Sequence, residues 1–124
     1  MKKQIICKEA PPAIGPYSQA IHANGMLFIA GQLPISPETG KVVDGIETQT
    51  RQVLENIKAI ITTAGGTMDN IVKCNVFLLD MADFAAMNGI YKEYFNEPAP
   101  ARATVAVAGL PPNVIVEIEA VAVL

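Results

Sequence analysis

The chain has 124 residues, of which 51% are hydrophobic and only 17% charged, and its formal net charge is −3. This length fits one domain, residues 1–124, and no apolar run approaches the roughly 20 residues that a membrane-spanning helix needs. The small acidic charge, the absence of a basic cluster longer than Lys2-Lys3 and the absence of Trp all argue against a nucleic-acid-binding protein.

The first part of the chain predicts short strands joined by rigid loops. Residues 4–7 favour a strand, and residues 10–17, which contain three prolines, favour a turn-rich loop. Residues 18–23 and 26–31 are β-type runs on either side of Asn24-Gly25, a dipeptide typical of the type I′ hairpin turn. A β-hairpin is therefore expected at this place.

Two helices are predicted further along. The first spans residues 46–64, where apolar residues recur at steps of three and four, and Gly65-Gly66 ends it. Asp44 with Glu47 resembles a capping box at its start. The second helix begins after Asp80, a favourable N-cap residue. Its apolar face consists of Phe84, Met87, Tyr91, Tyr94 and Phe95.

Strand-like sequence fills residues 71–79, 103–108 and 114–124. The order β-β-β-α-β-α-β-β predicts an α+β fold with a mixed sheet of about six strands and two helices on one face. Several of these strands are apolar on both sides, which is typical of sheets covered on both faces. Because two helices can cover only one face, we expect the other face to be buried against further copies of the chain.

Cysteine and histidine are too few to support a metal site. Cys7 and Cys74 lack a C-x-x-C spacing, and the N-terminus does not resemble a signal peptide, so two free thiols in the cytoplasm are expected. His22 is the only histidine, which excludes an H-E-x-x-H zinc motif and leaves little support for a Ser/His/Asp site.

Glu117 interrupts the otherwise apolar run 114–124. Period-two alternation places it on the same strand face as Glu119. Placing a carboxylate on a sheet face that is partly shielded from water costs free energy, unless the carboxylate is paired or has a functional role. Glu117 is therefore a candidate catalytic group, with a solvated strand end or an ion pair between subunits as the structural alternatives.

Arg102 is one of only two arginines, and the other, Arg51, lies early in the first predicted helix, where a solvated position is natural. Arg102 follows a proline-stiffened segment and precedes a strand, and arginine is suited to bind a carboxylate through two hydrogen bonds. It could equally pair with Glu117 or Glu119 across adjacent antiparallel strands. The spacing alone does not separate these readings.

Tyr17, Asn88 and Gly31 are weaker candidates. Tyr17 leaves a constrained loop beside a strand, and Asn88 lies on the apolar stripe of the second predicted helix. Tyrosines and buried amides in such places are more often packing residues than ligands. Gly31, at the end of the hairpin, indicates a close approach of the backbone to another group.

Together these residues resemble the RidA/YjgF family of reactive-intermediate deaminases, in order and over essentially the whole chain. The matching segments are Ala13–Gln19, Gly31–Pro34, Asn56–Ile60, Val76–Phe84, Pro100–Val105, Leu110-Pro111 and Val116–Ala120. The chain departs from the family at Ala30, where members often carry Ser or Thr, and at Ala103-Thr104, where they often carry Ser-Cys.

The resemblance implies a chorismate-mutase-like fold and a homotrimer with sites between subunits. It also implies hydrolysis of 2-imino acids, such as 2-iminopropanoate and 2-iminobutanoate, to 2-keto acids and ammonia. In that reading Arg102 binds the substrate carboxylate, Glu117 positions or activates water, and Tyr17 helps to close the pocket. The residues expected at the substrate are Arg102, Tyr17, Gly31, Thr104 and Asn88. No metal, cofactor, nucleic acid or membrane is expected to take part.

Two other functions remain open at this point. The same arginine-lined cleft could bind a keto or amino acid without turnover, as a regulatory trimer, and the resembling family has been linked to regulatory, chaperone-like and ribonuclease roles. A nuclease is the least favoured function, because the sequence offers neither a metal cluster nor a basic groove to hold phosphates.

Overall fold

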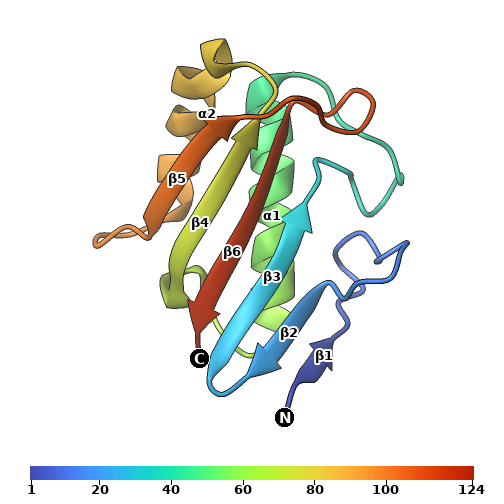
Figure 1. Ribbon diagram of the computed structural model, residues 1–124, viewed down its shortest axis with the longest axis vertical. Coiled ribbons are helices and arrows are strands. Elements are labelled where there is room, and N and C mark those ends of the chain that lie inside the picture. The colour runs from blue at the N-terminus through green and yellow to red at the C-terminus, as the bar shows by residue number, and fades with distance from the viewer.

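The computed structural model describes all 124 residues and confirms the α+β architecture. One six-stranded mixed sheet, in the order β1-β2-β3-β6-β4-β5, carries both α-helices on the same face (Figure 1). The strands are β1 (Lys3–Ile5), β2 (Ala20–Ala23), β3 (Met26–Gln32), β4 (Ile71–Leu78), β5 (Ala101–Ala106) and β6 (Val116–Val123). The helices are α1 (Ile46–Thr63) and α2 (Phe84–Tyr91), with single 3₁₀ turns η1 (Met68–Asn70), η2 (Met81–Asp83) and η3 (Lys92–Tyr94).

The predicted hairpin is confirmed as β2–β3, joined at Ala23↔Met26. Asn24 and Gly25 both have positive φ, 52° and 74°. A type I′ turn requires this conformation at both central positions, and Asn and Gly adopt it at little cost.

Helix α1 is confirmed, but its predicted capping box is wrong. The N-cap is Gly45, at φ 87°, and no side chain bonds to the first turn. Because Gly45 takes the N-cap position, Asp44 lies one residue outside the helix, and its side chain makes no hydrogen bond to the free N–H groups of the first turn. The C-terminal signal is correct, because Gly65 follows the helix at φ 94°.

The alternative in which Arg102 pairs with Glu117 or Glu119 across adjacent antiparallel strands is excluded. Strand β5 pairs only with β4, in parallel, with Arg102 beside Cys74. Strand β6 lies between β3 and β4 and is antiparallel to both. The chain from β4 through α2 to β5 is a β-α-β crossover, and such a connection places its two strands side by side and parallel. Glu117 consequently lies opposite Phe77, and Arg102 has no β6 neighbour.

The two faces of the sheet have different surroundings. Twenty-one buried residues form a core cluster, and Val116 and Ile118 of β6 are fully buried within it. The opposite face has no helix (Figure 1), and it leaves Phe28, Val105 and Val123 45–47% exposed. This is the uncovered apolar face that the strand pattern predicted. Neither helix is long and apolar enough to cross a bilayer.

Candidate functional site

The predicted site residues form two groups on opposite faces of the sheet. Arg102 and Asn88 meet on the helix-covered face, with Thr104 beside them on β5. Glu117 and Gly31 meet on the open face, and Gly31 and Tyr17 line one cavity.

Arg102 is held by one face of α2. Its Nη1 donates a hydrogen bond to Asn88 Oδ1 at 2.7 Å. Its guanidinium carbon lies 4.7 Å from the ring centroid of Tyr91 and 5.5 Å from that of Phe84. Arg102 is half-buried and forms no ion pair, since the one ion pair of the chain joins Arg51 to Glu93. A half-buried cation without an internal carboxylate is a favourable place for an anionic ligand.

Thr104 follows Arg102 on the same face of β5, because strand side chains alternate. Its Oγ1 atom is buried and has no hydrogen-bond partner within the chain. Buried hydroxyls are nearly always hydrogen-bonded in folded proteins. The Thr104 hydroxyl is therefore a free polar group on the same strand face as Arg102.

Glu117 lies half-buried on the open face, across Gly31. A Cβ atom at Gly31 would come within 3.0 Å of Glu117 Cδ and would collide with Oε2. Burial raises the pKa of Glu117 above its ordinary value, and the negative charge of Glu119 raises it further. Glu119 is in turn held by Asn75, whose Nδ2 donates to Glu119 Oε2 at 3.3 Å. A carboxylate with a raised pKa is a better proton acceptor than an ordinary one.

Tyr17 lies on the rim of a cavity of about 270 Å³ between the loops around residues 11–19 and 31–40. Its ring is about half exposed, and its backbone N–H donates to Gly15 O at 2.8 Å. No charged side chain lines this cavity. Gly31 lines this cavity together with Tyr17 and also lies against the Glu117 side chain, so the cavity and the carboxylate share one neighbour.

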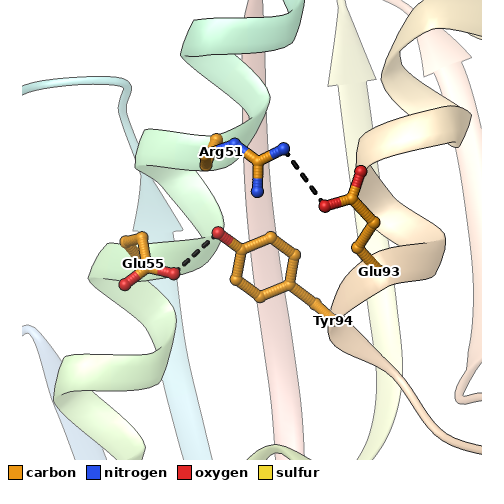
Figure 2. Close-up of polar contacts among 4 residues, drawn as sticks. All are labelled: Arg51, Glu55, Glu93 and Tyr94. Atoms are coloured by element: carbon orange, nitrogen blue, oxygen red, sulfur yellow. Dashed lines mark hydrogen bonds and ion pairs between the residues drawn. The ribbon is translucent and has the colours of Figure 1, made fainter.

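The largest surface hollow, about 500 Å³, lies elsewhere, between α1 and η3. Figure 2 shows its main contacts: Arg51 Nη2 lies 3.1 Å from Glu93 Oε1, and the Tyr94 hydroxyl donates to Glu55 Oε2 at 2.6 Å. Burial and the bond to Glu55 raise the pKa of Tyr94 to about 12. Because these polar groups satisfy one another, we interpret the hollow as a surface network that links two helical segments. The expected solvated position of Arg51 is confirmed, with 47% of its side chain exposed.

The sequence did not identify Phe84 and Tyr91 as neighbours of Arg102. Both were expected only as packing residues of the second helix. Phe84, Asn88 and Tyr91 follow one another at steps of four and three, so they lie on one helical stripe. Asn88, a polar residue between two aromatic residues on this stripe, was the feature of the sequence that could have indicated a contact with a polar group.

Comparison with known proteins gives a consistent result. The family described as Endoribonuclease L-PSP matches residues 7–124. A RutC family protein of Pyrococcus horikoshii is 57% identical over 98% of this chain and 98% of its own. The chloroplastic Reactive Intermediate Deaminase A of Arabidopsis thaliana is 48% identical over all of this chain and 67% of its own. The crystal structure of Escherichia coli TdcF with bound serine superposes with a TM-score of 0.94 at 44% identity, covering 98% of both chains.

Proposed function

Because the chain belongs to the Endoribonuclease L-PSP family, which includes the reactive intermediate deaminases, we propose that it hydrolyses 2-imino acids to 2-keto acids and ammonia. The first candidate substrates are 2-iminopropanoate and 2-iminobutanoate, met in the cytoplasm. The deaminase name of a 48%-identical relative supports the reaction class, and the two residue groups described above support the assignment of roles.

The observation that carries the proposal is the unpaired guanidinium of Arg102. A 2-imino acid bears a carboxylate next to the reacting C=N carbon. Arg102 has no acidic partner and uses Nη1 for Asn88, which leaves Nη2 and Nε to bind two carboxylate oxygens. Thr104 offers a further hydrogen bond beside it. The bound serine of TdcF, a small molecule with a carboxylate, is consistent with a ligand of this size.

Glu117 supplies the acid–base chemistry. It accepts a proton from water as the water oxygen attacks the imine carbon, and the C=N double bond becomes a single bond. Glu117 then returns the proton to the nitrogen, which gives a carbinolamine. Glu117 next takes the hydroxyl proton and transfers it to the amino nitrogen, so that the C–N bond breaks, the C=O bond forms and ammonia leaves. An imine is already electrophilic, so one positioned carboxylate and a bound water are sufficient. Tyr17 covers the site from the rim of the adjacent cavity.

Each active site is formed by two chains. The sheet lies between Arg102 and Glu117 of one chain, since Arg102 faces α2 and Glu117 faces the open side. One small ligand therefore reaches Arg102 of one subunit and Glu117 of the next. The exposed apolar face supplies the contact surface, and a homotrimer provides three such sites in a closed ring.

The endoribonuclease activity in the family's description is not proposed for this chain. A nuclease has to hold several phosphates, and this protein has a net charge of −3. Of its two arginines, Arg51 is paired with Glu93 and Arg102 is half-buried against α2.

A coupled assay tests the proposal. 2-Iminopropanoate or 2-iminobutanoate is generated in situ, and its decay is followed with the native protein, with Arg102→Ala and without protein. We expect faster decay with the native protein and little acceleration with the variant. Equal decay in all three, with the protein folded and oligomeric, would contradict the proposal and favour a binding or regulatory role.

A further inference from the structure

The two arginines of the chain are held in different ways. Arg51 forms an ion pair with Glu93 at 3.1 Å, and its guanidinium carbon lies 6.0 Å from the ring centroid of Tyr94. Arg102 has no acidic partner, and its aromatic contacts are closer, at 4.7 and 5.5 Å. The first arrangement neutralises the guanidinium charge, whereas the second orients the guanidinium and leaves its charge available.

The aromatic contacts of Arg102 come from a rigid surface. Tyr91 is only 5% exposed, and its ring packs against Phe95 with centroids 4.7 Å apart. Phe84, two stripe positions before Tyr91 on α2, packs against the core cluster. Asn88 lies between them and fixes the guanidinium by its hydrogen bond. Side chains with few accessible rotamers position a neighbour at a small cost in entropy.

We propose that Phe84 and Tyr91 are positioning residues for Arg102, which hold its guanidinium by their ring faces so that an unneutralised charge meets the substrate carboxylate. This inference rests on the proposed function. An aromatic face attracts a cation without neutralising it, so the substrate does not have to displace an internal carboxylate. An acidic partner at the same place would compete with every anionic ligand.

The positioning role belongs to the ring of Tyr91 and not to its hydroxyl. That hydroxyl is buried and makes no hydrogen bond of good geometry. It lies near the buried thiol of Cys74, and burial is the main cause that raises the pKa of both groups, which keeps them neutral. A phenylalanine at residue 91 would therefore hold Arg102 as well as tyrosine does.

The test compares Tyr91→Leu, Phe84→Leu and Tyr91→Phe with the native protein. We expect Tyr91→Leu to raise KM for the imine, and Kd for the product analogue 2-oxobutanoate, by about tenfold. The value of kcat stays within about twofold, because the lost contact acts on carboxylate binding. Phe84→Leu shows the same pattern to a smaller extent, and Tyr91→Phe restores values near native. In an Arg102→Ala background, Tyr91→Leu has no further effect on Kd.

Tyr94→Leu is the matched control, because it removes an aromatic residue from beside Arg51 and leaves the site unchanged. If Tyr91→Leu does not fold, Phe84→Leu and its combination with Arg102→Ala decide the question. Native-like Kd values in the folded leucine variants would overturn the positioning role while leaving the proposed function intact. An equal increase in Kd when Tyr91→Leu is made in the Arg102→Ala background would also overturn the positioning role. If the native protein neither binds 2-oxobutanoate nor accelerates imine decay, both proposals are wrong.

Discussion

The carboxylate of Glu117 lies directly against Gly31, in the space that a Cβ atom of residue 31 would fill. Gly31 is not needed for a left-handed backbone conformation, since its φ is not positive. It is needed because a larger residue would displace the carboxylate. The glycine lies where the β3–β6 register shifts, between Ile29 and Gln32, so the irregular strand and the missing side chain together make room for Glu117.

Gly31→Ala is expected to impair catalysis much more than folding. The added methyl group pushes against the end of a flexible side chain, so the free energy of unfolding changes by less than about 1 kcal/mol. The carboxylate of Glu117 has to move away to make room for the methyl group. A displacement of a catalytic group by about the size of that overlap lowers kcat by about 10²-fold. Steady-state kinetics and urea unfolding of the same variant measure the two effects.

Gly89→Ala is the matched control for that variant. Gly89 lies in α2, and a Cβ atom there would meet nothing within 4 Å. Alanine is favoured over glycine in a helix by about 0.8–1 kcal/mol, so we expect a modest gain in stability and native kinetics. Similar loss of activity in both variants would show that the Gly31 effect is not specific to Glu117.

Glu117→Gln separates turnover from binding. Glutamine keeps the shape of the side chain but cannot accept a proton, so kcat should fall by about 10²–10⁴-fold. Binding of 2-oxobutanoate through Arg102 should stay within about threefold of native, measured by titration calorimetry. Unchanged turnover would exclude the acid–base role, and loss of binding alone would point to a structural role.

The pH profile depends on the carboxylate pair of β6. Glu117 has to be ionised to accept a proton, so the rate falls as the pH drops through its raised pKa. Glu119→Gln removes the neighbouring negative charge and keeps an oxygen that can accept the hydrogen bond of Asn75. The pKa of Glu117 then decreases, and the acid limb of kcat/KM moves to lower pH. An acid limb that does not move, or that moves to higher pH, would contradict this coupling.

Asn56 connects α1 to the loop beside the cavity. Its Nδ2 donates to Leu33 O at 3.1 Å and to Ile35 O at 3.0 Å, and the residue is 1% exposed. Asn56→Ala leaves these carbonyls without a side-chain donor and should cost about 2–3 kcal/mol in unfolding free energy. Gln52→Ala, which removes only the bond to Asn56 Oδ1, should cost less than about 1 kcal/mol. Urea unfolding at a fixed protein concentration compares the two variants.

Local features of the fold could be predicted from the sequence. The Asn24-Gly25 turn, the span of α1 and the alternation along β6 each depend on residues close together in the chain. Strand order could not be predicted in the same way, because it depends on packing between distant segments. The β4–α2–β5 crossover was the missed clue, since a strand, helix and strand in succession favour parallel neighbours.

The site residues were predicted individually, but their arrangement was not. Period-two alternation assigns Glu117 to one face of its strand and Arg102 to one face of its own strand. Only the strand order shows that these two faces lie on opposite sides of the sheet. The aromatic contacts of Arg102 were missed for the same reason. The stripe of Phe84 and Tyr91 is visible in the sequence, but the position of β5 beneath it is not.

The most direct test of a site shared between subunits is complementation between two inactive variants. Arg102→Ala and Glu117→Gln chains are co-expressed with different tags, and mixed oligomers are purified through both tags and assayed for imine hydrolysis. In a trimer that contains both kinds of chain, one of the three sites combines a native Arg102 with a native Glu117, so activity should return to about a third of native. Mixed oligomers no more active than either variant alone would contradict a site built from two chains.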